Sequence, residues 1–428
     1  MFIKEGGSLT AHLQCVRRAT NAIAIASSEQ KNTLLHTIAN KLLEHKAAIL
    51  AANKQDKESA QQLGFSAALI DRLSLENRLH AFVEDIYTVA DLPDPIGHRY
   101  REKILANGLR LYKQRVPLGI LAVIYESRPN VTIDVACLAL KSGNAVVLRG
   151  GKEVLRTNRA LIEAIHEALQ ICQLPCDLIT FIDTEDRALL QELLRKYELI
   201  DLVIPRGSGQ LHQFCRENSS IPVITGGIGI CHLFVDETVQ LDKAIAVIHN
   251  AKTQRPTVCN ALDTLLIHRL IAKDLIPPLV ETLAQAGVTF CAEEAAFALM
   301  PEALRQRGEG IVRLAQLRDW DTEWLNLTLG IKVVDDLQSA IEHIHAHSSG
   351  HSDGILTENK EHAALFCQKI DSAVVYVNAS TRFTDGGQLG LGSEVAVSTQ
   401  KIQARGPMGL EELTSYKWIV EGDYHVRS

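Results

Sequence analysis

Apolar residues repeat with a helical period over most of the first ninety positions. From 8 to 91 they recur every three or four residues, and Lys, Glu and Gln fill the positions between them. This spacing places the apolar side chains on one face of a helix. The clearest stripe contains Leu34, Leu35, Ile38, Leu42, Leu43, Ile49 and Leu50. We therefore predict that 8–91 is almost entirely helical and that Leu-Pro-Asp-Pro-Ile-Gly (92–97) ends the helical region.

The period changes in 104–115, where apolar and polar residues alternate on either side of Asn107-Gly108. Asn-Gly is a preferred pair for a two-residue hairpin turn in which both central residues have positive φ. The segment therefore predicts a β-hairpin with a turn of that type. The residues alone are compatible with an ordinary surface ribbon and with a contact to another subunit.

Strand and helix patterns alternate from 119 to 204 and again from 231 to 378. Alternation of this kind predicts parallel sheets with helices on both faces. The expected strands are 119–125, 145–148, 178–182, 199–204, 231–235, 262–268, 331–334, 354–356 and 374–378. The expected helices are 131–141, 157–169, 187–196, one beginning at 241, 271–285, 337–345 and 360–370. The stretch 293–324 is poorly patterned. Ligands of such sheets bind at the carboxyl ends of the strands, so the loops there are the candidate sites.

Composition narrows the functional classes. A chain of 428 residues with 46% hydrophobic content can form two or three cores. The formal net charge of −7 argues against a surface for nucleic acid or anionic membranes. The sequence shows neither an apolar run of about 20 residues nor a secretory signal. Nine scattered cysteines without a Cys-x-x-Cys pair are typical of a reducing cytosol. We expect a cytoplasmic protein without nucleic-acid or membrane partners.

Cys259 lies where a helix should end. Pro256 disfavours helix in the residue before it, so the helix that begins near 241 should stop close to Arg255. Cys259 then falls in a short turn before the apolar run 262–268. A thiol in such a break can be reached by a substrate. A lone intracellular cysteine is also commonly a small core residue, and the residues alone leave both interpretations open.

Three loops follow predicted strands. Arg149-Gly-Gly-Lys152 follows one strand, and Pro205-Arg-Gly-Ser-Gly-Gln210 follows another. Small residues in the second loop would let backbone N–H groups approach a phosphate at the start of a helix. The last glycine of a dinucleotide fingerprint would fall at His212, so a tight structural turn is an equal alternative. The third loop, 127–132, carries Asn130, which could cap the following helix.

Five segments together resemble one protein family. They are 127–132 (Ser-Arg-Pro-Asn-Val-Thr), 224–229 (Ile-Thr-Gly-Gly-Ile-Gly), 254–260 (Gln-Arg-Pro-Thr-Val-Cys-Asn), 340–353 and 377–387. They resemble the aldehyde dehydrogenase superfamily and are most similar to its glutamate-5-semialdehyde dehydrogenase, or gamma-glutamyl phosphate reductase, branch. The segments follow the order of that branch. The resemblance implies an α/β, aldehyde dehydrogenase-like fold with a Rossmann-type cofactor domain, an α/β catalytic domain and a small oligomerisation ribbon.

The resemblance also implies how the chain is divided into domains. We expect an NADP-binding domain in 1–100 and 118–228 and a catalytic domain in 229–372. An oligomerisation hairpin (101–117) would pair with a tail (373–428) and make the protein a homo-oligomer. The implied reaction is NADPH-dependent reduction of L-glutamyl 5-phosphate to L-glutamate 5-semialdehyde, with release of phosphate, in L-proline biosynthesis. Glutamate kinase, which makes the acyl phosphate, is then a candidate partner. Alternatives are an acyl-CoA-using or hydrolytic aldehyde dehydrogenase, a cysteine hydrolase and a non-catalytic scaffold.

The same resemblance assigns roles to individual residues. Cys259 would be the nucleophile, and Asn130 would join the Cys259 N–H in binding the oxyanion. Arg149 and Lys152 supply positive charge for a 2′-phosphate, or form a solvated surface pair. The other expected cofactor-binding residues are Gly207, Ser208, Gly209, Gly226 and Gly227. Arg255 and Arg382 would bind the substrate carboxylate or phosphate, or serve as structural ion-pair partners.

The segment around Ile224 lacks an acidic residue. Hydrolytic relatives carry a general-base Glu in the segment that here reads 223–227, where Ile224 stands, and no acid occurs from 218 to 235. We therefore expect a thioester on Cys259 to resist hydrolysis.

His343, His347 and His351 are spaced four apart, as in a helical metal site. Ser348-Ser-Gly350 should end that helix before His351, and we predict no metal.

Overall fold

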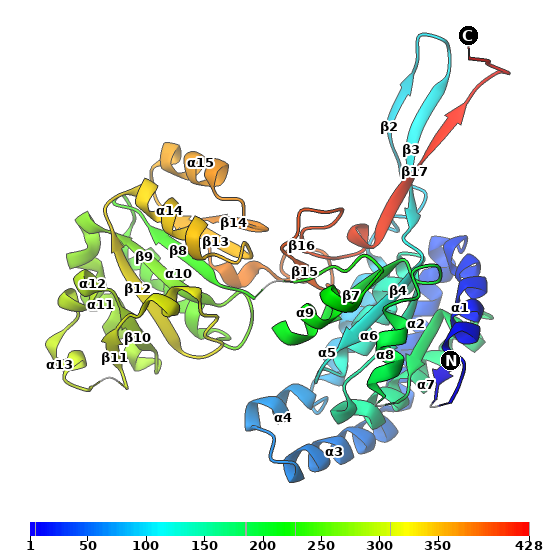
Figure 1. Cartoon of the computed structure of the whole chain (residues 1–428), viewed down its shortest axis with the longest axis horizontal. Coiled ribbons are helices and arrows are strands. Elements are labelled where there is room, and N and C mark those ends of the chain that lie inside the picture. Colours follow the sequence, from blue (N-terminus) through cyan, green and yellow to red (C-terminus); the bar gives the residue numbers. More distant parts are fainter. Residues whose placement is uncertain (5, 185, 227, 309, 428) are drawn as a thin grey trace. The chain divides into compact units, whose positions relative to one another are not determined.

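The computed structural model describes residues 1–4, 6–184, 186–226, 228–308 and 310–427. The chain forms two compact units (Figure 1). Unit 1 contains Met1–Gly226, Gly390–Ala396 and Ile402–Ser428. Unit 2 contains Gly227–Leu389 and Val397–Lys401. Within the described residues, no helix combines the length and the apolar character that a membrane span requires.

Unit 1 is built on a parallel sheet in the order β1-β6-β5-β4-β7. The strands are β1 (Phe2–Ile3), β4 (Ile120–Tyr125), β5 (Ala145–Arg149), β6 (Ile179–Ile182) and β7 (Leu202–Arg206). Every residue of β4 is buried, as a central parallel strand covered on both faces requires. The chain leaves β4 toward β5 and β6 and returns to β7 on the other side of β4. The loops after β4 and β7 therefore flank the topological switch point, where α/β sheets bind ligands.

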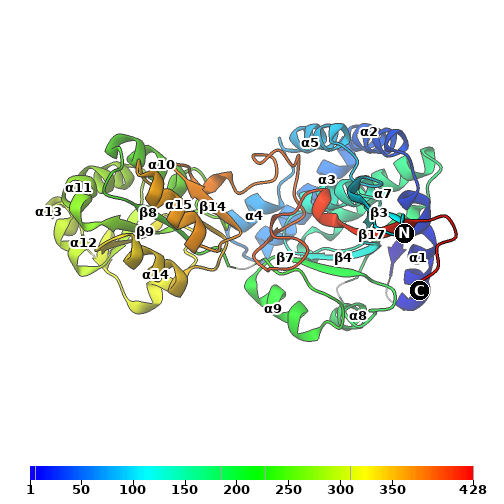
Figure 2. The same cartoon turned by 90° about the horizontal axis from the view of Figure 1, so that it is seen from above.

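Helices cover both faces of this sheet (Figure 2). They are α1 (Leu9–Ala24), α2 (Ser28–Glu44), α3 (Lys46–Gln62), α4 (Ala67–Leu73), α5 (Leu79–Asp91), α6 (Asn130–Lys141), α7 (Leu155–Ile171), α8 (Arg187–Leu193) and α9 (Gly209–Asn218), with short 3-10 turns η1 (Lys152–Val154) and η2 (Cys176–Leu178). α6 and α7, backed by α2, α3 and α5, lie on one face, and α8 and α9 lie on the other. The helical prediction for 8–91 is confirmed. Ser27 and Gln30 form a capping box that starts α2.

The predicted hairpin is confirmed, but its predicted turn is wrong. β2 (Arg99–Ile104) and β3 (Arg110–Pro117) are antiparallel, and β17 (Thr414–Glu421) pairs with β3 as the family resemblance implied. This ribbon extends away from the rest of unit 1 (Figure 1). Gly108 has a φ of 91°, whereas Asn107 does not have positive φ. The Asn107 Oδ1 atom instead accepts the Leu109 N–H at 3.2 Å, which needs no left-handed residue at 107.

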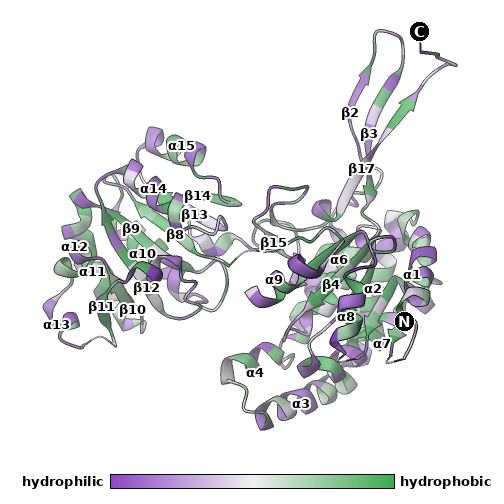
Figure 3. Cartoon of the chain, viewed as in Figure 1, coloured by the Kyte–Doolittle hydropathy of each residue, from purple (hydrophilic) through white to green (hydrophobic). Residues whose placement is uncertain are grey.

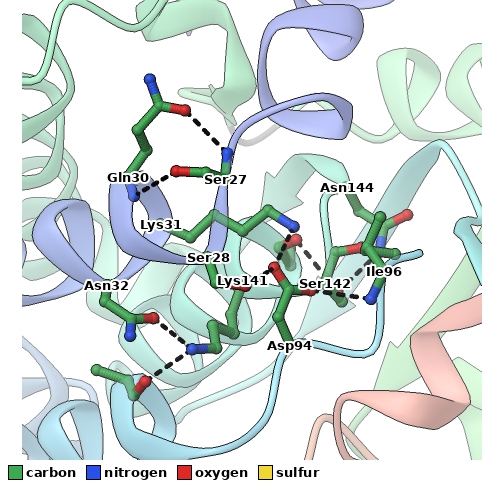
Figure 4. Close-up of polar contacts among 12 residues, drawn as sticks. Ser27, Ser28, Gln30, Lys31, Asn32, Asp94, Ile96, Lys141, Ser142 and Asn144 are labelled. Atoms are coloured by element: carbon green, nitrogen blue, oxygen red, sulfur yellow. Dashed lines mark hydrogen bonds and ion pairs between the residues drawn. The ribbon is translucent and has the colours of Figure 1, made fainter. Parts of the chain in front are cut away.

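A buried polar cluster fixes the segment that leads into this ribbon (Figure 4). Lys31 is fully buried and its Nζ donates to the Asp94 carboxylate at 2.8 Å. Lys141, at the end of α6, donates to the Ala90 carbonyl at 2.7 Å. The other Asp94 oxygen accepts the Ile96 N–H at 2.9 Å. Burial lowers the pKa of Lys141, and the Asp94 charge opposes that shift. The predicted break at 92–97 is thus a turn anchored to α2, and α6 is tied to the end of α5.

Unit 2 contains a second parallel sheet, in the order β11-β10-β12-β9-β8-β13-β14. Its strands are β8 (Cys231–Val235), β9 (Leu262–His268), β10 (Thr289–Ala292), β11 (Val312–Leu314), β12 (Thr328–Val334), β13 (Ser352–Leu356) and β14 (Val374–Val377). Apolar residues follow the strands of both sheets (Figure 3). Leu233 and Val235 enter the core on one face and Phe234 enters the core on the other. The alternation explains why β8 reads as a continuous apolar run.

The helices of unit 2 are α10 (Leu241–Thr253), α11 (Arg269–Gln285), α12 (Glu294–Leu299), α13 (Glu302–Arg305), α14 (Leu337–His347) and α15 (Lys360–Lys369). Residues of α10 and α11 contribute to one core, and residues of α14 and α15 contribute to the other. The poorly patterned stretch 293–324 holds α12, α13, β11 and the 3-10 turn η3 (Leu317–Asp321), which are too short to show a period. The remaining elements are η4 (Thr381–Phe383), β15 (Val397–Ser398), β16 (Gly406–Pro407) and η5 (Glu411–Leu413).

Candidate active site

Cys259 occupies the turn that its sequence context predicts. α10 ends at Thr253, with Gln254 as its C-cap, just before Arg255 and Pro256. The chain then turns and enters β9, and Cys259 is half-buried in that turn. The position combines partial access to solvent with a backbone held between two regular elements. A residue in such a place can meet a substrate without losing its orientation.

Neighbouring segments hold the backbone around Cys259. Gly229 lies so close that a Cβ on it would be 1.7 Å from the Cys259 carbonyl oxygen. The Cys231 thiol donates to the same oxygen at 3.2 Å. On the other side, the Asn260 amide donates to the Thr384 carbonyl at 2.8 Å. The Thr381 hydroxyl donates to the Asn260 carbonyl at 2.7 Å. The turn is therefore fixed to the start of β8 and to η4.

Two arginines lie within electrostatic range of this turn. Arg382, in η4, donates from Nε to the Gln254 side chain at 2.9 Å. Burial lowers the pKa of Arg382, the charges of Asp385 and Cys259 raise it, and the nearby Arg255 lowers it. The structure thus places Arg382 within electrostatic range of both Cys259 and Arg255 in unit 2. Guanidinium groups in this position favour a negatively charged substrate.

A buried hydroxyl network lies behind the turn. Ser352 and Tyr376 each place an oxygen against the Thr384 hydroxyl, at 2.6 and 2.7 Å. His351 Nδ1 lies 2.9 Å from the Ser352 hydroxyl. Burial raises the pKa of Tyr376 to about 12 and raises the pKa of Cys231 well above its usual value. Cys231 is therefore a neutral donor to the Cys259 carbonyl and a poor nucleophile.

Glu323 is a residue of this site that sequence reasoning missed. Its carboxylate accepts the Gly229 N–H at 3.0 Å, and Gly229 in turn packs on Cys259. The segment between η3 and β12 carries it, inside the stretch 293–324 whose pattern predicted no element. Nothing in the local sequence distinguishes it from a surface acid. Its relation to Cys259 depends on a contact across 94 residues.

The three histidines spaced four apart do not all lie on one helix. α14 ends at His347, as predicted, so His351 lies beyond it. His343 is buried, with its ring 4.5 Å from that of His347 and 5.6 Å from that of His232. Burial lowers the pKa of His343 to about 2, so this side chain is neutral. In the described part of the chain, no three His, Cys, Asp or Glu side chains are arranged to hold a metal ion.

In unit 1, Asn130 is the first residue of α6 and does not cap it. Pro129 holds the N-cap position, and no side-chain cap bond forms there. The Asn130 amide instead donates to the Asp134 carboxylate, one turn along the helix, at 2.9 Å. Burial raises the pKa of Asp134 to about 7, and the bond from Asn130 opposes that rise. The capping alternative is therefore wrong, and the amide is oriented by a neighbouring acid.

The loop after β5 carries the two predicted cations. Arg149 is the last residue of β5, and Lys152 is exposed at the start of η1. Glu153, the adjacent acid, accepts the N–H and the hydroxyl of Ser127, each at 2.7 Å. Ser127 has a φ of 48°, which is uncommon for a residue with a side chain. Contacts with Ser127 therefore engage this carboxylate and leave Lys152 as the exposed charge of the loop.

The loop after β7 leads into α9 as predicted. Ser208 is the N-cap of α9, and Gly207 and Gly209 flank it. The Glu126 carboxylate accepts the Ser208 N–H at 2.8 Å, and a Cβ on Gly207 would lie 2.3 Å from the same carboxylate. Gly226 lies at the end of unit 1, and Gly227 lies outside the described residues. Ile224 is fully buried, and its N–H donates to the Val203 carbonyl, so the position at which hydrolytic relatives carry a general-base Glu is apolar core.

Comparison with known proteins identifies the protein family to which this chain belongs. Residues 10–311 match the model of the aldehyde dehydrogenase family. The chain belongs to that family, whose members are oxidoreductases that use a nicotinamide cofactor. The aldehyde dehydrogenase-like α/β fold expected from the sequence is confirmed.

More particular similarities point to one branch. The chain is 54% identical to the gamma-glutamyl phosphate reductase of Shewanella piezotolerans, and the match covers 96% of each chain. It is 45% identical to gamma-glutamyl phosphate reductase from Thermotoga maritima, whose crystal structure matches with a TM-score of 0.93 over 99% of this chain and 100% of that one. An acetylating aldehyde dehydrogenase from Geobacillus thermoglucosidasius matches at 19% identity over 98% and 97% of the chains, with a TM-score of 0.71, which shows the fold alone.

Proposed function

We propose that this protein catalyses NADPH-dependent reduction of L-glutamyl 5-phosphate to L-glutamate 5-semialdehyde, with release of phosphate, in L-proline biosynthesis. The observation that carries the proposal is the full-length similarity to gamma-glutamyl phosphate reductases. The position of Cys259 in a half-buried turn beside Arg255 and Arg382 supports it, because the substrate carries both a carboxylate and a phosphate.

In the proposed mechanism Cys259 is the nucleophile. Its thiolate attacks the acyl carbon, a C–S bond forms, and the C–O bond to phosphate breaks. Arg255 and Arg382 hold the anionic groups of the substrate and offset the charge of the departing phosphate. The Cys259 N–H binds the oxyanion that develops beside the sulfur, with Asn130 as the second donor assigned from the family resemblance. NADPH, when bound, would supply a hydride to the acyl carbon of the thioester. The C–S bond then breaks, which releases the aldehyde and restores the Cys259 thiolate.

The residues of unit 1 support NADP as the cofactor. Lys152 is exposed, and contacts with Ser127 engage the adjacent Glu153. The exposed positive charge of Lys152 suits a 2′-phosphate better than the ribose hydroxyls of NAD. Ser208 at the start of α9, between Gly207 and Gly209, would contact the diphosphate. Gly226 and Gly227 are assigned to the cofactor from the resemblance. These roles make 1–100 and 118–228 the cofactor domain and 229–372 the catalytic domain.

The ribbon supports a homo-oligomer. β17 exposes Tyr416, Trp418 and Val420, with 46%, 50% and 58% of each residue accessible. Several exposed apolar and aromatic side chains on one strand are typical of a surface that contacts a second copy of the chain. We therefore propose that the oligomerisation contact expected in 101–117 and 373–428 is made by β2, β3 and β17. Residues 373–389 belong instead to unit 2, where Arg382 lies in η4. We also propose a cytoplasmic location. Glutamate kinase is a candidate partner, since a separate kinase must supply the acyl phosphate.

The test is a direct assay of the proposed reaction. The protein is mixed with NADPH and glutamyl phosphate generated by a kinase and ATP, and the nicotinamide absorbance is followed with time. We expect consumption of NADPH, formation of the semialdehyde and release of one phosphate for each turnover. Cys259→Ser should fold normally and lose activity by several orders of magnitude, because an alcohol is far less ionised than a thiol near neutral pH. Activity with an acyl-CoA in place of the acyl phosphate would contradict the proposal.

A further inference from the structure

We propose that the Glu126 carboxylate competes with the cofactor diphosphate for the start of α9 and thereby sets the affinity for the dinucleotide. Its carboxylate accepts the Ser208 N–H at the start of α9 and has to leave Ser208 when the diphosphate binds. The inference rests on the proposed NADP site. It adds a residue of the β4 loop that determines how tightly the cofactor is held.

The contacts of the carboxylate are those expected of a bound anion. One Glu126 oxygen accepts the Ser208 N–H at 2.8 Å, and the other lies 3.4 Å from the Ser208 hydroxyl. Gly207 has no side chain to exclude it, since a Cβ there would lie 2.3 Å from the carboxylate oxygen. The free N–H groups and the dipole at the start of a helix attract negative charge. Glu126 satisfies that attraction from within the chain.

The backbone at Glu126 is held, so its side chain is the part able to move. The Glu126 N–H donates to the Arg206 carbonyl at 3.0 Å and continues the pairing of β4 with β7. The next residue, Ser127, is fixed by its two bonds to Glu153. The Glu126 side chain itself is only half-buried. Rotation of this side chain therefore frees the Ser208 N–H without unfolding either loop.

The Glu126 carboxylate and the cofactor diphosphate cannot occupy the start of α9 at the same time. A carboxylate and a diphosphate cannot accept the same N–H, and like charges this close repel each other. The free energy needed to break the Glu126 contact is subtracted from the binding free energy of the dinucleotide. Removing the charge should therefore tighten binding. A Glu126 that served as a ligand of the cofactor, for example on a ribose hydroxyl, would have the opposite effect.

The experiment measures nucleotide affinity on the full-length protein by isothermal titration. The proteins compared are the wild type, Glu126→Gln and Glu217→Gln, a matched change of charge on an exposed residue near the other end of α9. We expect Glu126→Gln to bind NADPH and ADP about tenfold more tightly, as loss of one competing charged hydrogen bond predicts. Adenosine 2′-monophosphate lacks the diphosphate, and its affinity should not change. Glu217→Gln should match the wild type with all three nucleotides.

Each alternative outcome has a distinct meaning. Unchanged or weaker binding of NADPH by Glu126→Gln would overturn the inference, and so would an equal gain for adenosine 2′-monophosphate. If wild type and variants all failed to bind NADPH, the proposed function itself would fall. A second measurement needs no variant: in a crystal structure of the wild type with NADPH, a diphosphate oxygen should replace Glu126 at the Ser208 N–H. Retention of the Glu126 contact in that complex would also overturn the inference.

Discussion

Gly229 packs directly on the backbone of Cys259. A Cβ at position 229 would lie 1.7 Å from the Cys259 carbonyl oxygen and 2.8 Å from its Cα atom. No side chain larger than hydrogen fits this space unless one of the two segments moves. The geometry of the nucleophile is thus set by a residue without a functional group, about thirty positions before it in the sequence.

Gly229→Ala should therefore damage the site although it adds a single methyl group. We expect the turn around Cys259 to shift, activity to fall about 100-fold, and stability to decrease by about 1–3 kcal/mol. Activity and the urea midpoint are measured together. Gly310→Ala is the matched control in unit 2, because a Cβ there would meet no atom within 4 Å. Full activity of Gly229→Ala would show that the turn tolerates displacement.

Asn130→Ala tests the proposed second oxyanion donor. Loss of one such donor lowers turnover about 100-fold or more, while NADPH binding should remain intact. Because the Asn130 side chain does not cap α6, the substitution should leave the helix in place. Steady-state kinetics and the circular dichroism spectrum are the readouts. A change confined to the substrate KM would make Asn130 a binding residue instead.

Asp134→Asn tests the carboxylate that orients Asn130. Burial raises the pKa of Asp134 to about 7 in the folded protein, above its usual range near 4. The folded state therefore binds this proton more tightly than the unfolded state. The resulting stabilisation is full below about pH 4 and is lost as the pH rises toward 7. Asp134→Asn should flatten the dependence of the urea midpoint between pH 4 and 7. An unchanged pH dependence would show that Asp134 does not titrate in this range.

Lys152→Glu should shift cofactor preference from NADPH toward NADH. The substitution removes an attraction for the 2′-phosphate and adds a repulsion. The measurement is the ratio of the two kcat/KM values. Lys196→Glu is a control for the change in charge within unit 1; Lys196 follows α8 and contacts Thr10 and Glu192. If Lys152→Glu leaves the ratio of the kcat/KM values unchanged, this loop does not recognise the 2′-phosphate of NADPH.

The apolar environment of Ile224 leads to a prediction for the reverse reaction. With glutamate semialdehyde and NADP but no phosphate, we expect about one NADPH per active site and then a stall, since no base activates water beside the thioester. Adding phosphate should restart turnover. Glu323→Gln is the sharpest comparison, because Glu323 is the carboxylate that the fold brings to Gly229. Steady turnover without phosphate that disappears in Glu323→Gln would identify Glu323 as a hydrolytic base and contradict the reductase assignment.

Patterns that depend on neighbouring residues predicted the fold well. The bounds of β8 and β9 agree with the expected 231–235 and 262–268, because a buried parallel strand is a short apolar run between polar turns. β1 has only two residues and shows no pattern of its own. The turn at Asn107 was mispredicted because a side-chain contact with Leu109 replaced the positive φ that the Asn-Gly pair suggested.

Contacts between distant residues could not be predicted in the same way. Glu126 and Ser208 are 82 positions apart, and Gly229 and Glu323 are 94 apart. In the sequence each acid resembles an ordinary polar residue in a loop. The importance of each acid depends on a contact that forms only in the folded chain. For Glu126 the contact joins the ends of the adjacent strands β4 and β7, and for Glu323 it joins the segments before β12 and β8. The glycines at 207 and 229 were visible in the sequence, but the groups that need their space were not.

The insertion of Gly227–Leu389 within unit 1 has a consequence for synthesis on the ribosome. β3 is complete long before its partner β17, and the bonded side chains of Tyr112 and Glu421 are 309 positions apart. At translation rates of about 5–20 residues per second, this separation corresponds to roughly 15–60 seconds. During that interval the nascent chain carries an unpaired strand edge, which is prone to aggregate. Arg110, Lys113 and Arg115 place three positive charges along this strand. Positive side chains along a strand edge disfavour its pairing with a second chain before the last strand is made.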